Sequence, residues 1–337
     1  MTNRHLHDAL RDSLVALVWS QWTALGVAGT APRPHSIVDP EALLVATMSI
    51  GRWDARLFDE VLDWLSKNMN VVDSARLRRL ARNSEPEQRR LVAAAVRLVS
   101  GGQTSGGLRR VEADFVARET QSEYAVQPLF RTPRQAPQDW VVADEVFASV
   151  GFQRPMAELR GMSRRPDTAN PECLRFKARA LVGLGPRAEV LTYLWTHEWA
   201  HGRLIADRGA YNQSPVAEYL AELSAARLVD KRVDGRRTEY RLVEPLRSVG
   251  ATAPLYVAWD RAWPALVEVL GALDSPALSA DAQWSRLAVS LNNARSGLAA
   301  EGFDVHVPDL TGWALQGPRV LEAIMDAIVG RLRELGA

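Results

Sequence analysis

The stretch IADRGAYNQSPVAEYLAELSAARLV, residues 205–229, decides how this chain of 337 residues is interpreted. Apolar residues at 204–206 are typical of a short helix, and the polar run that follows is typical of a turn. Ser214 is then the expected N-cap of a second helix, with Pro215 at its first position. The apolar face of that helix recurs at helical spacing, at Val216, Leu220, Leu223 and Ala226. The pattern predicts two short helices joined by a tight turn, the second over 214–226.

The residues on both sides extend this pattern. One face of an earlier helix is apolar, at Val190, Leu191 and Leu194. Downstream, residues 228–233 and 236–243 alternate between apolar and polar, and Asp234–Gly235 between them is a strong signal for a β-hairpin turn. The sequence therefore predicts three helices followed by a hairpin within 187–243.

This succession resembles the winged helix-turn-helix domain of bacterial transcription regulators in the broad ArsR and MarR groups. In those regulators an Ile/Leu-Ala pair opens the second helix, and a Ser-Gln-Ser type of turn precedes the recognition helix, which a Leu-x-x-Leu-x-x-x-Gly-Leu-Val run closes. The chain matches this motif without a gap, at Ile205, Ala206, Gln213, Ser214, Val216, Leu220, Leu223, Leu228 and Val229. The resemblance covers about 60 of the 337 residues. It implies a DNA-binding domain over 187–246.

The resemblance also implies a function: a sequence-specific transcription regulator that binds double-stranded DNA as a homodimer. Helix 214–226 would enter the major groove, and the wing, 231–241, would hold the backbone or the minor groove. Within this arrangement Gln213 suits adenine, Glu218 suits cytosine N4, and Tyr219 would pack or contact a phosphate. The implied DNA contacts are Arg203, Arg208, Asn212, Gln213, Ser214, Ala217, Glu218, Tyr219, Lys231, Arg232, Arg236, Arg237 and Arg241.

Two residues depart from the regulator pattern. Arg227 stands where these regulators commonly have Gly, so a non-Gly residue is expected in a left-handed conformation there. Glu218 stands where a basic or small polar residue is common. Segment 187–243 holds nine Lys plus Arg and eight Asp plus Glu, so it supplies little net charge for phosphate neutralisation. A module for protein interaction, antitoxin-like or scaffold-like, therefore stays open as the alternative function.

Residues 196–201, THEWAH, contain the H-E-x-x-H spacing of zinc peptidases. That chemistry needs His197 and His201 on one helix face as zinc ligands, Glu198 as the general base, and a third ligand. In the register above, the first helix ends near Thr196 and the second begins near Ala200, so the two histidines need not share a face. A zinc peptidase, or a regulatory metal site on the same histidines, is the least favoured interpretation. We therefore assign no catalytic or metal-binding residue.

The flanks predict a mainly α, multi-domain protein. Helical periodicity fills residues 1–118, where Asp39 is an expected N-cap with Pro40 as the first helical residue. Residues 119–186 are expected to form a connecting region, and 247–337 a helical C-terminal domain for dimerisation or sensing. Either helical flank has enough apolar surface to build a dimer interface.

Basic residues are concentrated in the middle of the chain. Residues 76–110 carry nine Arg and two Glu, which favours two solvated helix faces, although a contact with nucleic acid stays open. The loop at 163–166, SRRP, is likewise interpreted as a solvated loop rather than a minor-groove arm. The formal net charge of the whole chain is only +1.

Composition excludes several classes of function. Cys173 is the only cysteine, which rules out an intrachain disulfide and a cysteine-based zinc site and fits the cytoplasm. No apolar run approaches the ~18 residues of a membrane span, and the first apolar stretch is better explained as an amphipathic helix than as a signal peptide. The glycine-rich stretch at 100–107 lacks the Lys-Ser/Thr ending of a phosphate loop, and there is no dinucleotide fingerprint. We therefore expect a protein without a cofactor that is not an enzyme.

Overall fold

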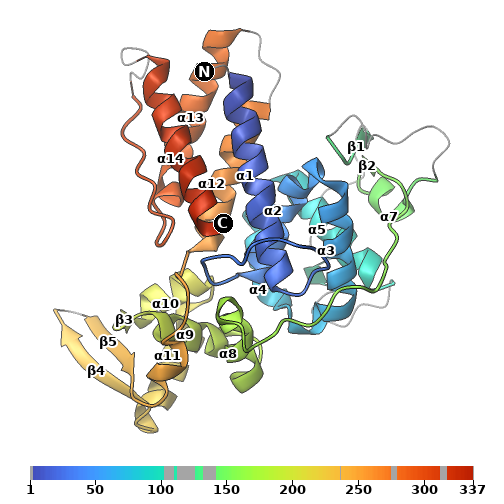
Figure 1. The fold of residues 1–337 in the computed structure, drawn as a ribbon. Helices are drawn as coiled ribbons and strands as arrows, with labels where there is room; N and C mark the ends of the chain where they lie inside the picture. Colours follow the sequence, from blue (N-terminus) through green and yellow to red (C-terminus); the bar gives the residue numbers. More distant parts are fainter. Residues whose placement is uncertain are drawn as a thin grey trace.

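The computed structural model describes residues 3–101, 110–111, 126–131, 142–235, 237–274, 279–311 and 317–336. The described chain is mainly helical with a few short strands, as the sequence predicts (Figure 1). The helices of the N-terminal half are α1 (Asn3–Ala24), α2 (Pro40–Ile50), α3 (Ala55–Asn68), α4 (Ser74–Arg82), α5 (Pro86–Val99) and the short α7 (Glu145–Ala148). Those of the C-terminal half are α8 (Leu174–Val182), α9 (Pro186–Thr196), α10 (Gly202–Gly209), α11 (Gln213–Ala225), α12 (Trp259–Asp274), α13 (Ala280–Leu298) and α14 (Pro318–Gly336).

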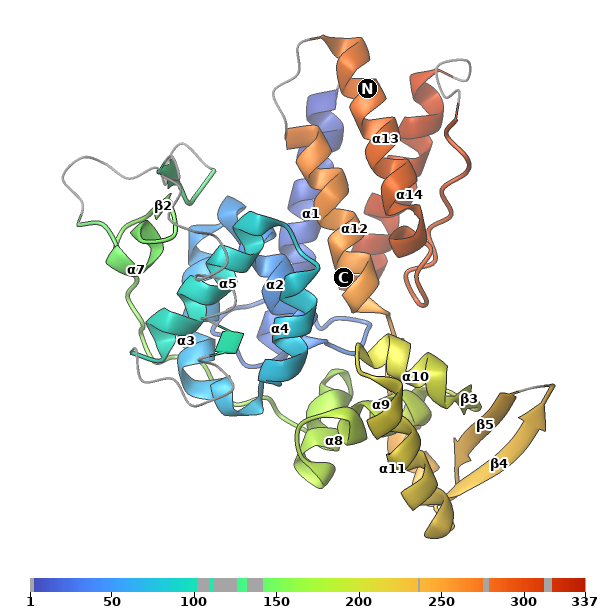
Figure 2. The ribbon, with the colours of Figure 1, turned by 180° about the vertical axis from the view of Figure 1, so that it is seen from behind.

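One apolar core joins the two ends of the chain. Helix α1 buries Leu10, Leu14 and Leu17 on one side, and α14 buries Leu321 and Ile328 against the same core. Helix α12 packs against both α1 and α2. The helices predicted as separate N-terminal and C-terminal domains thus form one body, because apolar stripes far apart in sequence cover each other (Figures 1 and 2).

Local capping chemistry sets several helix starts in this body. The Asp39 carboxylate accepts a hydrogen bond from the backbone N–H of Ala42, and Pro40 is the first residue of α2, which confirms the predicted cap. Asp54 caps α3 and Asp73 caps α4 in the same way. These carboxylates satisfy N–H groups that a helix leaves without partners in its first turn.

A second, smaller core lies under α8, α9, α10 and α11. Strands β3 (Ala200–His201), β4 (Val229–Asp234) and β5 (Arg237–Leu242) form an antiparallel sheet in the order β3-β5-β4. The predicted hairpin is confirmed: Asp234 pairs with Arg237, and Gly235 in the turn has a φ of 59°. In both views α11 and the hairpin lie at the end of the molecule opposite the bundle of α13 and α14 (Figures 1 and 2).

A further short sheet pairs β1 (Gln127–Pro128) in parallel with β2 (Phe152–Gln153) beside α7. Of the described helices, none combines the length and the apolar character needed to cross a membrane. The glycine-rich stretch at 100–107 and the predicted connecting region fall partly outside the described residues, at 102–109, 112–125 and 132–141.

Candidate nucleic-acid interface

Helix α11 is held by an apolar face and presents a polar one. Val216, Leu220 and Leu223 are buried against α9 and α10, which contribute Val190 and Ile205 to the same core. The opposite face is exposed to solvent. It carries Asn212, Gln213, Ser214, Ala217 and Glu218. The structure therefore brings five of the residues predicted from the sequence together on one surface.

The start of α11 differs from the prediction by one residue. The helix begins at Gln213, and Asn212, with extended backbone at φ −70° and ψ 152°, occupies the N-cap position. Ser214 is therefore not the N-cap. Because it already lies inside the first turn, its hydroxyl donates instead to the Glu218 carboxylate at 2.8 Å. The predicted range 214–226 is shifted to Gln213–Ala225.

Tyr219 belongs to the buried side of α11. The residue is 8% exposed, and the guanidinium of Arg187 lies 5.1 Å from the ring centroid. Burial raises the pKa of its hydroxyl. The sequence predicted that Tyr219 would either pack or contact a phosphate, and in the structure it packs.

The outer face of α11 has an uneven charge. No Lys or Arg lies between Gln213 and Ala225 in the sequence. Glu222 accepts two hydrogen bonds from Arg187 of α9, at 2.9 and 2.8 Å, and both side chains are exposed. The first turn of α11 is thus neutral and polar, whereas the next turns carry two carboxylates.

Helices α10 and α11 are both followed by a residue in the left-handed backbone conformation. Arg227 has a φ of 57°, which confirms the left-handed conformation predicted for this position. The backbone N–H of Leu228 then donates to the carbonyl of Leu223 and closes the end of α11. Ala210 has a φ of 56° after α10, and the N–H of Tyr211 donates to the carbonyl of Ala206. Both turns are short, so α10 and the hairpin approach α11 closely.

One face of the hairpin carries a tryptophan and two arginines. The guanidinium groups of Arg232 and Arg241 lie at 4.3 and 4.6 Å from the ring centroid of Trp199. The same two arginines pair with carboxylates: Arg232 with Glu239 at 2.7 Å, and Arg241 with Asp230 at 2.9 Å. These two predicted DNA contacts are therefore engaged within the hairpin, although both keep solvent-accessible surface.

Two further predicted cations lie on the hairpin, and one lies on α10. Lys231 and Arg237 are exposed on the hairpin, and Lys231 lies 5.8 Å from the ring of Tyr240. Arg203 is exposed on α10. Arg236 lies outside the described residues.

Arg208 faces inward rather than toward the outer surface. Its Nε donates to Glu301 at 2.7 Å, and the same carboxylate contacts the His197 ring at 2.5 Å and the Tyr193 hydroxyl at 3.1 Å. Burial raises the pKa of Glu301, but the hydrogen bonds from His197 and Arg208 outweigh it and lower the pKa to about 2. The predicted phosphate contact of Arg208 is thus replaced by a link between α10 and the loop after α13.

The histidines of THEWAH belong to different elements. His197 is the extended C-cap of α9, at φ −127° and ψ 138°, and His201 lies in β3 and is the N-cap of α10. The Nδ1 atom of His201 accepts a hydrogen bond from the N–H of Leu204. The separation of the two helices predicted from the register is confirmed, and within the described residues no group of three metal-ligating side chains is placed to hold an ion.

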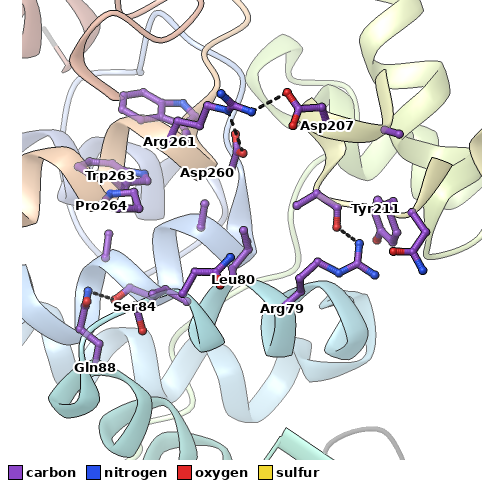
Figure 3. A pocket seen from close by; sticks show the side chains of 18 residues that line it. Arg79, Leu80, Ser84, Gln88, Asp207, Tyr211, Asp260, Arg261, Trp263 and Pro264 are labelled. Carbon is purple, nitrogen blue, oxygen red and sulfur yellow. Dashed lines mark hydrogen bonds and ion pairs between the residues drawn. The ribbon is translucent and has the colours of Figure 1, made fainter. Parts of the chain in front are cut away.

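The inner side of α10 borders a cavity of about 400 Å³ (Figure 3). Asp207, Ala210, Tyr211 and Asn212 line it from α10 and from the turn into α11. Helices α2, α4, α5 and α12 supply the other walls. The N-cap position of α11 is therefore shared between the outer surface and this cavity.

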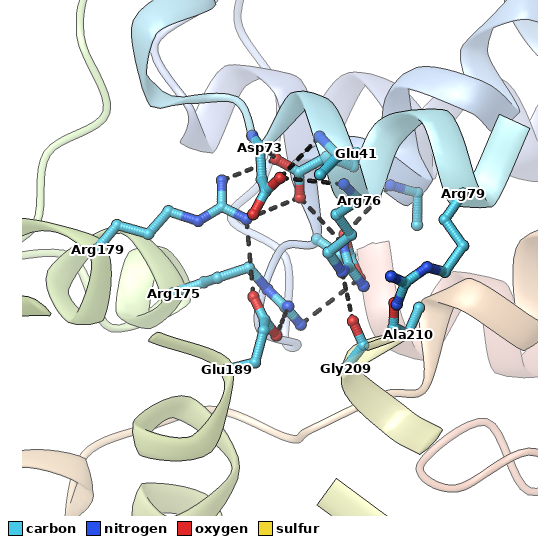
Figure 4. A network of polar contacts seen from close by, with 12 residues as sticks. Glu41, Asp73, Arg76, Arg79, Arg175, Arg179, Glu189, Gly209 and Ala210 are labelled. Atoms are coloured by element: carbon cyan, nitrogen blue, oxygen red, sulfur yellow. Dashed lines mark hydrogen bonds and ion pairs between the residues drawn. The ribbon is translucent and has the colours of Figure 1, made fainter. Parts of the chain in front are cut away.

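Side chains of helix α4 form hydrogen bonds with the turn between α10 and α11 (Figure 4). Arg76 donates through Nε to the carbonyl of Gly209 at 2.8 Å, and Arg79 donates to the carbonyl of Ala210. The hydroxyl of Tyr211 donates to Asp73, which also caps α4. Burial raises the pKa of the Tyr211 hydroxyl, and the carboxylates nearby raise it further.

Arg76 is one of three buried arginines in an ionic network (Figure 4). It contacts Asp39 at 2.5 and 2.6 Å and Glu41 at 3.0 Å. From α8, Arg179 contacts Glu41 at 2.7 Å, and Arg175 pairs with Glu189 of α9. Burial raises the pKa of Asp39, but Arg175 and Arg76 hold it well below its ordinary value. The network joins the body, α8, α9 and α10 through side chains that are almost fully buried.

Sequence reasoning missed these supporting residues. Trp199 lies inside THEWAH, but its place between two hairpin arginines depends on β3 pairing with β5. Glu301 lies 104 residues from His197 and 93 from Arg208, and Arg76 lies 37 residues from Asp39 and 133 from Gly209, so no local spacing connects these groups. The one available signal is the density of arginine at 76–110, for which the sequence favours two solvated helix faces, whereas Arg76 is fully buried.

The chain matches no protein-family model, and the comparisons with curated proteins and with solved structures found no significant match. The candidate interface therefore rests on its own geometry alone.

Proposed function

We propose that residues 187–246 form a winged helix-turn-helix domain and that the protein is a sequence-specific, DNA-binding transcription regulator. The observation that carries this proposal is the placement of α11. Its polar first turn is exposed beside α10, and its C-terminal end meets the base of a hairpin that projects from the same end of the molecule (Figure 2). A major groove about 12 Å wide admits such a helix, and a projecting hairpin can follow the adjacent backbone.

The exposed residues supply the two kinds of contact that DNA recognition needs. Gln213, Ser214 and Ala217 are available to base edges, and Glu218 is suited to cytosine N4. Arg203, Lys231 and Arg237 are the exposed cations around them and would contact phosphates. Asn212, at the N-cap position, would contact a phosphate next to the first-turn amides of α11.

A regulator of this type reads two half-sites, so we propose that two copies bind one palindromic DNA in the cytoplasm. The dimer contact then belongs to the helical body, because the outer faces of α11 and the hairpin are occupied by DNA. The spacing of the half-sites would follow from the distance between the two copies of α11.

The charge of α11 supports one alternative function. Glu218 and Glu222 stand on its outer face without a basic residue on the same helix. Carboxylates repel phosphates, whereas a basic surface on a partner protein would attract them. A protein-interaction module, antitoxin-like or scaffold-like, is therefore the second candidate.

Fluorescence anisotropy on labelled DNA from upstream of the protein's own gene separates the two functions. The titration is run at two salt concentrations, with Lys231→Ala/Arg237→Ala protein and a matched Arg319→Ala/Arg333→Ala control whose exposed cations lie on α14. Since each phosphate contact contributes a slope of about 0.9 in log K against log salt, the hairpin variant should lose about 2 from the slope and the control none.

Three results would decide the matter. A salt-dependent affinity that falls only in the hairpin variant supports the regulator. No binding at low salt contradicts it and favours the protein-interaction module. Equal losses in both double variants would mean that general positive charge, not this interface, binds the DNA.

A further inference from the structure

Helix α4 presents a basic face to solvent. Its nine residues include four arginines and no carboxylate. Arg76 is fully buried, whereas Arg78 and Arg79 are half-buried and Arg82 is exposed. Residues three and four apart share one side of a helix, so Arg82 lies on the same side as Arg78 and Arg79. We call these three residues the α4 basic face.

The α4 basic face begins beside the first turn of α11. Arg79 donates a hydrogen bond to the carbonyl of Ala210, and its guanidinium lies 5.4 Å from the ring centroid of Tyr211. The next residue, Asn212, occupies the N-cap position of α11. Figure 3 shows Arg79 extending from α4 toward this turn. Arg82 lies one helical turn, about 5 Å, further along α4.

The buried side of α4 fixes the position of this face relative to α11. Arg76 donates to the carbonyl of Gly209 and to the carboxylate of Asp39. The hydroxyl of Tyr211 donates to Asp73 at the start of α4. Because these contacts are between well-packed helices, the arginines of the α4 basic face stay at a fixed distance from the first turn of α11.

Several arginines of the proposed winged helix are occupied within the protein. Arg208 pairs with Glu301. Arg232 and Arg241 pair with carboxylates of the hairpin. The sequence of Gln213–Ala225 contains no Lys or Arg. Since phosphate neutralisation supplies much of the affinity for DNA, a DNA-binding surface centred on α11 needs cations from neighbouring elements.

The carboxylates near the α4 basic face leave it positive. Asp207 of α10 contacts Arg261 at 2.5 Å, and Glu87 of α5 contacts Arg52 at 2.5 Å. Glu85, in the turn after α4, is exposed and offsets one of the three arginines. The face therefore keeps the sign of charge that a phosphate backbone attracts.

We propose that the α4 basic face is a second part of the DNA-binding surface, on which Arg78 and Arg82 contact phosphates that flank the half-site read by α11. This inference rests on the proposed DNA-binding function. The guanidinium group offers several N–H donors in a planar fork that suits phosphate oxygens. DNA rises about 3.4 Å per base pair, so one turn along α4 reaches one or two base pairs beyond the first turn of α11. Such contacts add affinity and length of footprint but no base preference.

Fluorescence anisotropy and hydroxyl-radical footprinting of the full chain test the inference, on DNA from upstream of the protein's own gene. Arg78→Gln/Arg82→Gln removes both charges, and Arg78→Lys/Arg82→Lys keeps them. Arg319→Gln/Arg333→Gln, which removes two exposed cations of α14, is the matched control. Circular dichroism verifies that every variant is folded.

The Arg78→Gln/Arg82→Gln protein should lose about 2 from the slope of log K against log salt, since each phosphate contact contributes about 0.9. Its footprint should lose protection at one edge of each half-site and keep it in the centre. The lysine variant and the α14 control should keep the wild-type slope. An unchanged slope and footprint in the Arg78→Gln/Arg82→Gln protein would overturn the inference. So would an equal loss in the α14 control.

Failure of this inference differs from failure of the proposed function. DNA binding that is weakened by Lys231→Ala/Arg237→Ala, and not by Arg78→Gln/Arg82→Gln, overturns the α4 contact and leaves the regulator intact. DNA binding that is weakened only by the α4 variant supports the α4 contact and contradicts the proposed role of the hairpin. No binding of the wild type at low salt overturns both.

Discussion

The inner and outer sides of the α9–α11 unit both carry many charges, but they use them in opposite ways. On the inner side Arg76, Arg175 and Arg179 are almost fully buried and contact carboxylates at short distances. On the outer side Lys231 and Arg237 are exposed on the hairpin. Buried ion pairs fix one arrangement because an unpaired partner is costly, whereas exposed pairs contribute little to stability. The comparison indicates that the buried ion pairs on the inner side fix the position of the α9–α11 unit. The exposed cations on the outer side stay accessible to a binding partner.

Breaking the inner side should have the largest effect. Arg76→Ala leaves Asp39 and Glu41 buried without one of their arginines and removes the hydrogen bond to Gly209. We expect a loss of about 3–5 kcal/mol in the free energy of unfolding, the usual cost of breaking a buried pair. Urea denaturation measures it.

Arg79→Ala is the matched control on the same helix. Arg79 also donates to the turn, at Ala210, but its side chain is only half-buried and stacks on Tyr211. We expect a loss of about 1 kcal/mol for this variant. Equal losses for Arg76→Ala and Arg79→Ala would mean that burial of the network does not distinguish the inner side.

Glu301 lies between the two sides, and its contribution to the stability of the fold should depend on pH. The pKa of Glu301 is lowered to about 2 in the folded protein, so its ionised form stabilises the fold. That contribution is fully present above the ordinary pKa near 4.5 and is lost as the pH falls toward 2. Glu301→Gln should cost about 2–3 kcal/mol at pH 7 and remove this part of the pH dependence.

The pH experiment compares unfolding curves of wild type and Glu301→Gln protein between pH 7 and pH 3. The difference in stability should shrink as the pH falls below about 4.5, because the unfolded chain then binds a proton at Glu301 that the folded protein, with its lower pKa, does not bind. Glu334→Gln, which removes an exposed pair with Arg331, should change stability by less than about 1 kcal/mol at every pH. A difference that stays constant down to pH 3 would show that Glu301 acts by packing and not by charge.

The contrast between the two sides also separates what the sequence could predict from what it could not. The cap at Asp39 and the turn at Asp234–Gly235 depend on neighbouring residues, and both were predicted. The N-cap of α11 was misplaced by two residues, because Asn212 and Ser214 both suit a cap and local chemistry does not choose between them.

The contacts of the arginines were beyond local reasoning. Arg208 was predicted to face a phosphate, yet it pairs with Glu301, which is 93 residues away in sequence. Arg76 was interpreted as part of a solvated face, yet it pairs with Asp39 across 37 residues. Helical periodicity states which face is apolar, but an arginine can be buried wherever tertiary contacts supply its carboxylates.

The smallest expected effect lies on the outer side, at the end of α11. Arg227 is exposed and holds a φ of 57°, a conformation that costs little for Gly and more for other residues. Arg227→Gly should therefore raise the free energy of unfolding by about 0.5–1 kcal/mol, while Arg227→Ala, which removes the same charge and side chain without freeing the backbone, should not. Urea denaturation of the two variants decides between backbone strain and charge. A gain in both variants would mean that the positive charge of Arg227, and not its backbone, limits the stability of this end of the helix. A gain in Arg227→Gly alone would show that even the exposed side of the unit keeps a strained turn, as expected if the close approach of the hairpin to α11 is what that turn provides.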